Sequence, residues 1–233
     1  MAVTLEKFLN QYFYFVMSLL VAAVVVAGFG PTIDTRLLHP RSARPVILYV
    51  HAAIFTGWVI FFILQTALVS QRNARLHRAL GWWGAVLGAA IPVAGVATAI
   101  AMGCLAGHHG DDDAAFLALS FYDMLAFATA FGLAIHWRRK PEFHRRLMLV
   151  ATCGLTGAAF ARIMPATAPI EWVYVGADSF ILLGMVRDLL TMGRIHPVYR
   201  FALPASVLGQ TMALYLFLSQ PRVWLTITHR LIG

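Results

Sequence analysis

Charged residues are scarce in this chain. Asp, Glu, Lys and Arg together make up 12% of its 233 residues, whereas hydrophobic residues make up 60%. Soluble globular domains carry about 25% charged residues, which help to cover their surface in water. A chain this apolar has too few polar side chains to cover itself, so the composition excludes an ordinary soluble domain and predicts an integral membrane protein.

Lysine is almost missing, since it occurs only at Lys7 and Lys140. Neither lies within a long apolar stretch, so a retinal-type Schiff base, which needs a buried lysine, is excluded. The formal net charge of +8 therefore comes mainly from arginine. These arginines lie in short turns between apolar stretches, which is typical of topology signals and of contact with lipid headgroups. The charge thus indicates a lipid bilayer as the partner and no nucleic acid.

Cysteine is also rare, with Cys104 and Cys153 as its two positions. They fall near opposite ends of their expected helices, which argues against a disulfide, and two thiols alone cannot make a cysteine-based zinc site. The sequence has no glycine-rich phosphate loop and no His-Glu-x-x-His zinc helix. These absences argue against the common nucleotide-binding and metalloprotease sites.

Long apolar stretches fill most of the chain. They run approximately over 11–31, 45–70, 80–103, 114–137, 147–168, 172–191 and 200–220. Each is long enough for a helix to cross roughly 30 Å of hydrocarbon, and none shows the alternating pattern of a barrel strand. The sequence therefore predicts an all-α, polytopic membrane bundle of about seven transmembrane helices, forming a single domain over 1–233.

The two ends of the chain need separate interpretation. The stretch 11–31 is longer than the apolar core of a typical secretory signal, so we expect a retained helix, with a cleaved signal and six spans as the alternative. The last residues, 222–233, are too short to span. Apolar residues alternate there with His229 and Arg230, which indicates a short segment lying in the membrane interface.

Basic residues gather in loops that fall on the same side of the membrane if seven helices alternate. The three loops hold Arg72, Arg75 and Arg78; Arg138, Arg139, Lys140, Arg145 and Arg146; and Arg187, Arg194 and Arg200, and Lys7 joins them. The opposite side holds Asp111, Asp112, Asp113 and Glu171, with Arg36, Arg41, Arg44, Arg222 and Arg230. Because positive residues are enriched in cytoplasmic loops, this bias predicts a cytoplasmic N-terminus and a C-terminus outside.

A weak internal repeat suggests how the helices pair. A basic turn leads through a histidine into an apolar stretch three times, at 75–78, 142–145 and 194–197. Repeats of this kind are common in membrane bundles. We therefore expect a lone first helix followed by three helical hairpins.

Four ionisable side chains fall at a similar depth in four of the expected helices. They are His51, Asp123, Arg162 and Asp178, each about two turns from the outer end of its helix. A charge in hydrocarbon costs at least about 2.5–3.5 kcal/mol, so each group needs a partner or a function. We expect these four groups to form one polar pocket in the outer leaflet, completed by residues such as Tyr122.

The charges of this expected pocket do not balance, because one arginine faces two carboxylates. A protonated aspartate, a protonated His51 or a bound cation would restore the balance. The expected occupants are therefore a small ligand, a proton, or a metal ion held by His51, Asp123 and Asp178. The structural alternative is that Arg162 neutralises one aspartate while His51 bonds a backbone carbonyl.

Three more histidines, His77, His144 and His196, share a level on the cytoplasmic side. Three imidazoles could bind a metal ion. Arginines such as Arg78 and Arg145 adjoin them, however, and these repel a cation and suit lipid phosphate. We therefore expect this group of residues to face lipid headgroups.

Haem b is the other cofactor to consider. A bis-histidine haem needs two histidines at one depth on facing helices, and His51 has no such partner in the outer leaflet. Ligation by His51 and a methionine, Met102 or Met164, is the arrangement that remains.

Two sets of motifs resemble those of a known group of proteins. The first set is His-x-x-x-Phe-x-Gly-Trp from His51 and Leu-His-Arg-x-Leu-Gly ending at Gly81; the second is Phe143 to Met148 with Ala151-Thr152, then Asp188 followed by Gly193 to Pro197. In these the chain resembles bacterial multi-pass membrane proteins without an established activity, which implies an inner-membrane location. The elements are faintly similar to diheme ferrireductases and oxidase-assembly membrane proteins, although the paired intramembrane histidines of the former are missing.

Three functions remain open from the sequence. The first is a binding bundle whose outer polar pocket holds a small ligand, a metal ion or a proton, without a stated catalytic residue. The second is a haem-associated or redox membrane protein linked to oxidase biogenesis. The third is a proton-coupled transporter that uses the same acids. A membrane-protein partner or a homo-oligomer is compatible with each.

Overall fold

The computed structural model describes residues 2–40, 42–106 and 110–232, and within these ranges it contains helices and no strand. Arg41, one of the arginines expected on the outer side, lies outside the described residues. The helices are α1 (Ala2–Ile33) with a π-helical turn η1 (Asp34–Leu38), α2 (Val46–Ser70), α3 (Ala74–Ala106), α4 (Asp111–His136), α5 (Pro141–Gly154), α6 (Gly157–Ile163), α7 (Trp172–Met192), α8 (Pro197–Ser219) and α9 (Arg222–Ile232). The expected all-helical fold is confirmed.

Five of these helices are long and apolar enough to cross a membrane, namely α1 (continuing through η1), α2, α3, α4 and α8. A sixth span is formed if α5 and α6 are taken together, because they meet at a break with a bend of 42°. The stretch 147–168 was expected as one straight helix, and this break is the main difference from that expectation. The fold is that of a multi-pass membrane bundle with five to six apolar spans.

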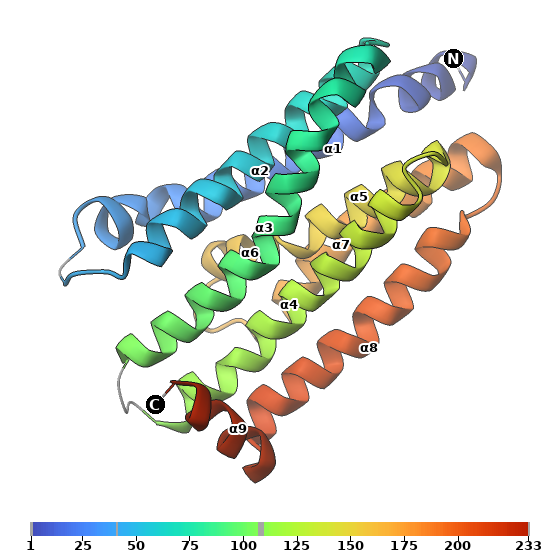
Figure 1. Ribbon diagram of the computed structural model, residues 1–233. Helices are drawn as coiled ribbons and strands as arrows, with labels where there is room; N and C mark the ends of the chain where they lie inside the picture. Colours follow the sequence, from blue (N-terminus) through green and yellow to red (C-terminus); the bar gives the residue numbers. More distant parts are fainter. Residues whose placement is uncertain (1, 41, 107–109, 233) are drawn as a thin grey trace.

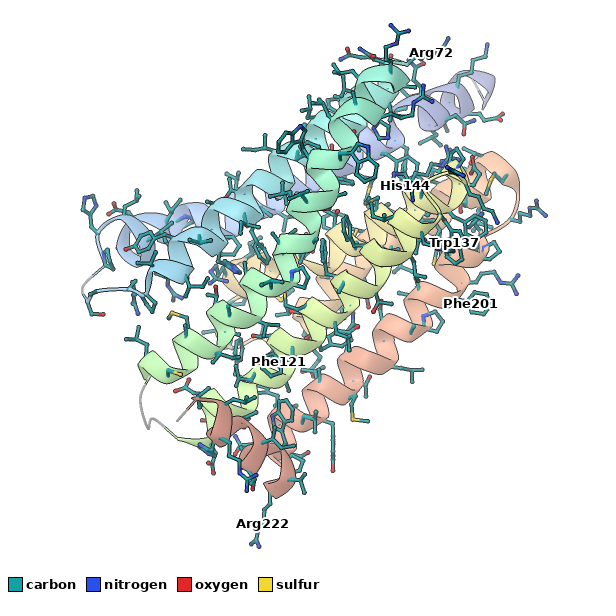
Figure 2. All side chains as sticks on the ribbon, viewed as in Figure 1. Arg72, Phe121, Trp137, His144, Phe201 and Arg222 are labelled. Carbon is teal, nitrogen blue, oxygen red and sulfur yellow. The ribbon has the colours of Figure 1, made fainter. Side chains whose placement is uncertain are left out.

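The helix ends sort into two groups at opposite ends of the bundle (Figure 1). The N-terminus and the loops 71–73, 137–140 and 193–196 lie together, and we call this the basic end. The loops before α2 and α7 and the turn between α8 and α9 lie at the opposite end. Figure 2 shows Arg72, Trp137 and His144 toward the basic end and Arg222 at the other. The three basic loops thus share one end of the molecule, as their alternation requires.

The central helix is α4, which packs against α3, α5, α8 and α9. The hairpin of α2 and α3 lies on one side of it, and α1 packs against α2, α6 and α7. Figure 1 shows α9 folded back beneath the ends of α4 and α8. Most helices therefore contact several neighbours, and α4 and α5 place side chains in the middle of the bundle.

Local sequence signals set several of the helix ends at the basic end. Pro141 and Pro197 begin α5 and α8 at positions where the missing N–H of proline carries no cost. The Nδ1 atom of His196 accepts a hydrogen bond from the N–H of Val198 at 3.2 Å and so caps α8. Gly193 ends α7 with φ at +63°, a conformation that glycine adopts without strain.

The apolar core is built around the aromatic face of α2. Trp58 meets Phe127 and Phe131 of α4 edge to face, with ring centroids 5.4 and 5.6 Å apart. Its Nε1–H donates to the hydroxyl of Thr152 in α5 at 3.3 Å, so its one polar atom is satisfied. Phe62, one turn further along α2, is buried in the same core. This face of α2 therefore packs against α4 and α5.

Two helices approach each other closely where Gly28 of α1 meets Ala159 of α6. A Cβ atom at Gly28 would lie 2.8 Å from Cα of Ala159, so the absence of a side chain is what permits the contact. Close approach through glycine is a common way to gain packing contacts between membrane helices, where lipid offers no hydrophobic drive.

We expect Gly28→Ala to destabilise the bundle. The added methyl group would press on the backbone of α6, which cannot turn aside as a side chain could, and overpacking of this kind costs about 1–3 kcal/mol. Gly30→Ala is the matched control, because nothing lies within 4 Å of a Cβ atom there. Thermal unfolding in detergent should show a lower Tm for the first variant alone; equal Tm values for the two variants would contradict this packing.

Candidate functional site

Asp123, Asp178 and Tyr122, all three partly buried, line one cavity of about 40 Å³. Tyr122 and Asp123 come from α4, and Asp178 comes from α7 together with Tyr174. The remaining walls are supplied by Ser206 and Gln210 of α8 and by Val150, Ala151 and Gly154 at the end of α5. Four helices thus bring two carboxyl groups to one small polar space.

Each of the two carboxyl groups of the cavity has a neutral partner. The hydroxyl of Tyr174 approaches Oδ1 of Asp123 at 3.4 Å, and Nε2 of Gln210 donates to Oδ1 of Asp178 at 3.0 Å. The hydroxyl of Tyr122 donates to the main-chain carbonyl of Ser206 at 2.9 Å. The two carboxyl groups are therefore held by a phenol and an amide, neither of which carries charge.

The size of the cavity limits what it can hold. Sites for organic ligands are usually about 300–1,000 Å³, whereas one water molecule needs roughly 10–15 Å³ of such volume. A space of about 40 Å³ has room for a few water molecules or one small ion. The arrangement suits proton or ion chemistry and excludes an organic ligand in this conformation.

The structure does not bring His51 and Arg162 into this cavity. The ring of His51 stacks on Phe55 with centroids 3.9 Å apart, and its Nδ1 is buried without a hydrogen-bond partner. Arg162 is exposed, donates to the carbonyl of Ala158 at 2.6 Å and lies 4.2 Å above the ring centroid of Phe29. The break before α6 directs Arg162 toward α1, so it makes no ion pair with either aspartate.

No group of three or more His, Cys, Asp or Glu side chains is arranged to hold a metal ion, as far as the described residues go. The set of His51, Asp123 and Asp178 is therefore not assembled as a metal site in this conformation. A cation at Asp123 and Asp178 would have to complete its coordination with hydroxyl, amide or water oxygens, without a histidine.

A second polar cluster, which the sequence did not reveal, lies at the basic end. Nε and Nη2 of Arg146 in α5 donate to the two carboxylate oxygens of Asp188 in α7, at 2.9 and 2.6 Å. Nη1 of Arg187 donates to the same carboxylate at 3.1 Å. The side chains of Arg146 and Asp188 are 0% exposed, and that of Arg187 is 1% exposed. Asp188 is thus a fully buried carboxylate between two arginines.

This cluster connects four parts of the chain. Nη2 of Arg187 donates to Asn10 in α1 at 2.6 Å, and the N–H of His196, just before α8, donates to Asp188 at 3.2 Å. Nη1 of Arg146 donates to the half-exposed carboxylate of Glu142 at 2.6 Å. Through these bonds the cluster ties α1, α5, α7 and the start of α8 together, although Nε of Arg187 is buried without a hydrogen-bond partner.

The sequence placed Arg146 and Arg187 among cytoplasmic loop residues, because a count of basic residues does not separate buried from exposed arginines. The signal that could have been used is Asp188, a carboxylate beside an arginine inside an otherwise apolar stretch. Such a group needs a partner from another helix. A buried Arg–Asp pair at the loop side of the bundle follows from that requirement.

The residues expected at lipid headgroups have different surroundings. Arg78 is exposed, whereas the Nη2 atom of Arg145 donates to Glu142 at 2.6 Å. His77 and His144 are partly buried and lie near each other, with ring centroids 6.4 Å apart and ring planes at 74°. His196 packs edge to face against Phe143 at 4.7 Å, and burial, followed by the charge of Arg146, lowers the pKa of its imidazole. At least two of these histidines therefore contact each other within the protein.

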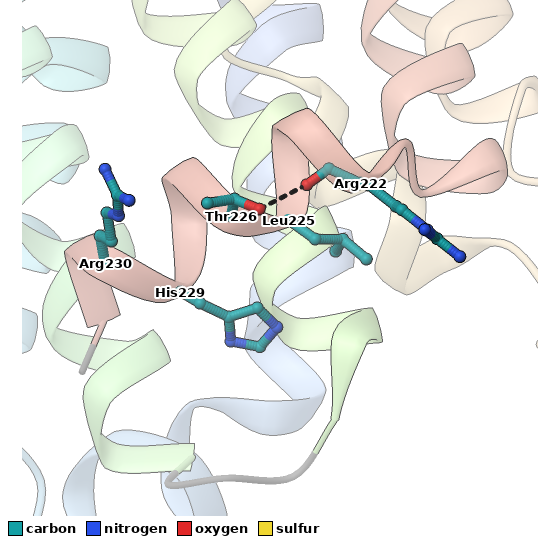
Figure 3. Close-up of a pocket in the computed structure, with 5 residues that line it drawn as sticks. All are labelled: Arg222, Leu225, Thr226, His229 and Arg230. Atoms are coloured by element: carbon teal, nitrogen blue, oxygen red, sulfur yellow. Dashed lines mark hydrogen bonds between the residues drawn. The ribbon is translucent and has the colours of Figure 1, made fainter.

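A larger hollow of about 540 Å³ runs along α9, away from the two carboxyl groups (Figure 3). It is lined by Arg222, Leu225, Thr226, His229 and Arg230. Figure 3 shows the side chains of Arg222 and Arg230 pointing in different directions, so they do not converge on one point. Val223 and Ile227 of the same helix are exposed apolar residues. This amphipathic character fits the interfacial segment expected for the C-terminus.

We predict that Asp188→Asn destabilises the protein strongly. Removal of one partner from a buried ion pair leaves uncompensated charge, here on two guanidinium groups, and typically costs about 3–5 kcal/mol. Glu142→Gln is the matched control, because this carboxylate also contacts Arg146 but is half exposed, and such pairs contribute about 1 kcal/mol or less. The measurement is unfolding of both variants in the same detergent. A similar decrease in unfolding free energy for the two variants would show that burial does not determine how much this cluster stabilises the protein.

A scan against protein-family models and searches of curated proteins and of solved structures found no match to this chain.

Proposed function

We propose that this protein is a proton-coupled membrane protein in which Asp123 and Asp178 take up and release protons. The single observation that carries the proposal is that both carboxyl groups line one small cavity inside the bundle without a cationic partner among the described residues. The position of Arg162, stacked on Phe29 and away from both carboxyl groups, removes the cation that the sequence had offered for them.

An isolated charge in an apolar interior is far more costly than a hydrogen-bonded neutral group, so an unpaired buried carboxylate tends to acquire a proton. A tyrosine hydroxyl and a glutamine amide can serve either state of these acids, since a hydroxyl both donates and accepts and an amide carries both kinds of atom. Loss of the proton can then be coupled to water entry, to movement of a solute or to a change in helix packing.

The break between α5 and α6 supports the same proposal. Gly154, the last residue of α5, lines the cavity, and the 42° bend to α6 follows directly. Transporters commonly place their ion-binding groups beside discontinuous helices near the middle of the membrane. A carboxyl site beside a broken span therefore favours transport or gating over a purely structural role.

The proposal includes a membrane topology. We infer seven spans, with α7 as the seventh, although it carries Asp178, Arg187 and Asp188. Asp188 pairs with both Arg187 and Arg146, and Glu142 supplies the second negative charge beside Arg146, which lowers the cost of placing this helix in lipid. We infer from the three basic loops that the basic end and the N-terminus face the cytoplasm. The resemblance of the motifs to bacterial multi-pass membrane proteins supports an inner-membrane location.

The test is proton flux into proteoliposomes that contain a pH-sensitive dye, driven by a potassium diffusion potential. We expect the wild-type protein to speed proton entry, and Asp123→Asn and Asp178→Asn each to slow it by about tenfold or more, as loss of a proton-transfer group does elsewhere. Asp113→Asn is the control, because it removes an exposed carboxylate from the first turn of the same α4.

Wild-type flux equal to that of protein-free liposomes would contradict proton transfer across the bundle. Full flux in both asparagine variants would contradict the role of this cavity. Size-exclusion profiles of the variants separate these outcomes from misfolding.

A further inference from the structure

His77 and His144 meet at the basic end although they come from different helices. They lie in the first turns of α3 and α5, and their ring centroids are 6.4 Å apart. Both rings are partly buried, and Nδ1 of His77 is buried without a hydrogen-bond partner. Buried polar atoms in proteins almost always have a partner, so an unpartnered imidazole nitrogen beside a second imidazole calls for an explanation.

Gln65 adds a third polar group at the same level. Both its Oε1 and Nε2 atoms are buried without a hydrogen-bond partner. The two helices α2 and α5 run antiparallel, and Trp58 of α2 donates a hydrogen bond to Thr152 of α5. Seven residues closer to the basic end, Gln65 on α2 is therefore level with Arg145 on α5, which is the neighbour of His144. The main chain of Gln65 also lies near His77. Gln65, His77 and His144 thus lie at one level of three helices, and the Gln65 amide and Nδ1 of His77 are buried without a hydrogen-bond partner.

A hydrogen bond to the main chain fixes the tautomer of His144 and leaves one ring nitrogen free to bind a metal ion. Its Nδ1 lies 2.9 Å from the carbonyl oxygen of Ala134, and a carbonyl can only accept, so Nδ1 carries the proton. In the neutral ring the lone pair is then on Nε2. Metal-binding histidines usually donate their other N–H to a carbonyl or carboxylate in this way, which fixes the tautomer and the orientation of the ring.

The separation of the two rings also suits a shared metal ion. With a metal–nitrogen distance of about 2.0–2.1 Å, each ring centroid lies roughly 3.2 Å from the metal, so two imidazoles on opposite sides of it are roughly 6.4 Å apart. The observed 6.4 Å equals this upper limit. A near-linear arrangement needs little movement, and a tetrahedral one needs the rings to approach by about 1 Å.

The nearby arginines do not oppose a cation as strongly as their sequence positions suggest. Arg145 donates to the carboxylate of Glu142 at 2.6 Å, so its charge is paired. Arg78 is exposed to the surroundings. The space between the histidines is therefore not occupied by a free guanidinium group.

We propose that His77 and His144, with the amide oxygen of Gln65, form a binding site for a transition-metal ion that prefers imidazole nitrogen, such as Cu⁺ or Zn²⁺. The site lies at the basic end, on different residues from Asp123 and Asp178. It does not depend on the proton-binding role of those acids, and the two proposals can fail separately.

The test uses the full-length protein without a histidine tag, purified in detergent. Zn²⁺ is titrated in competition with a chromophoric chelator, and Cu⁺ likewise without oxygen. We expect one equivalent of at least one of these ions per chain, an affinity at least tenfold weaker in His77→Gln and in His144→Gln, and X-ray absorption showing two imidazole ligands. His196→Gln is the matched control, a histidine of the same end whose ring faces Phe143, and it should bind as the wild type does.

Misfolding is controlled by the Tm measured without metal. His77→Gln is the decisive variant, because the Nδ1 atom it removes has no partner to lose, whereas His144→Gln also removes the bond to Ala134. Added metal should raise the Tm of the wild type and leave that of His77→Gln unchanged, since an ion stabilises only a state that binds it. The proposal is overturned if neither ion binds at one equivalent, or if His77→Gln binds as tightly as the wild type.

Discussion

The free-energy cost of removing a charge from water explains how the charged residues of this protein are arranged. A carboxylate inside an apolar bundle must either meet a cation or take up a proton. Asp188 has the first solution, because Arg146 and Arg187 both donate to it and all three side chains are buried. Asp123 and Asp178 have neutral partners, a tyrosine and a glutamine. The same residue type in one bundle is thus placed in two environments with opposite electrostatic consequences.

These two environments also differ mechanically. The cluster around Asp188 joins α1, α5, α7 and the start of α8, and breaking any one of its contacts would leave a buried charge less well paired. The cavity of Asp123 lies where α5 ends and the chain bends by 42° into α6. Packing at a helix break is easier to rearrange than a bidentate ion pair. The ion-pair cluster at the basic end is therefore suited to hold its helices in place. The helices around the cavity are suited to change their packing when a carboxyl group gains or loses a proton.

Hydropathy was enough to predict an all-helical chain with several apolar spans, because an apolar run of about 20 residues has few stable alternatives in lipid. It did not show that the stretch 147–168 is interrupted between α5 and α6. Hydropathy also indicated that Asp123, Tyr122 and Asp178 lie at one depth, and these three line the same cavity. Rotation about the helix axis cannot be read from depth alone. The sequence therefore could not show that the break at 155–156 turns Arg162 toward Phe29.

The cluster at the basic end was missed for a related reason. A charge count treats every arginine near a helix end as a loop residue, but Arg146 lies one helical turn inside α5 and is fully buried. The proximity of His77 and His144 depends on where the bundle places the first turns of α3 and α5, which no local pattern encodes. The sequence could predict local features such as the apolar stretches and the depth of a residue in its helix. It could not predict which side chains of different helices contact each other.

The most direct test of this account is the infrared spectrum of the carboxyl groups at neutral pH in the membrane. The account predicts a band from a protonated carboxyl group that disappears in Asp123→Asn or in Asp178→Asn and persists in Asp113→Asn. A wild-type spectrum with every carboxyl group ionised would contradict it, because two carboxylates without a cationic partner would then share one small cavity without a proton.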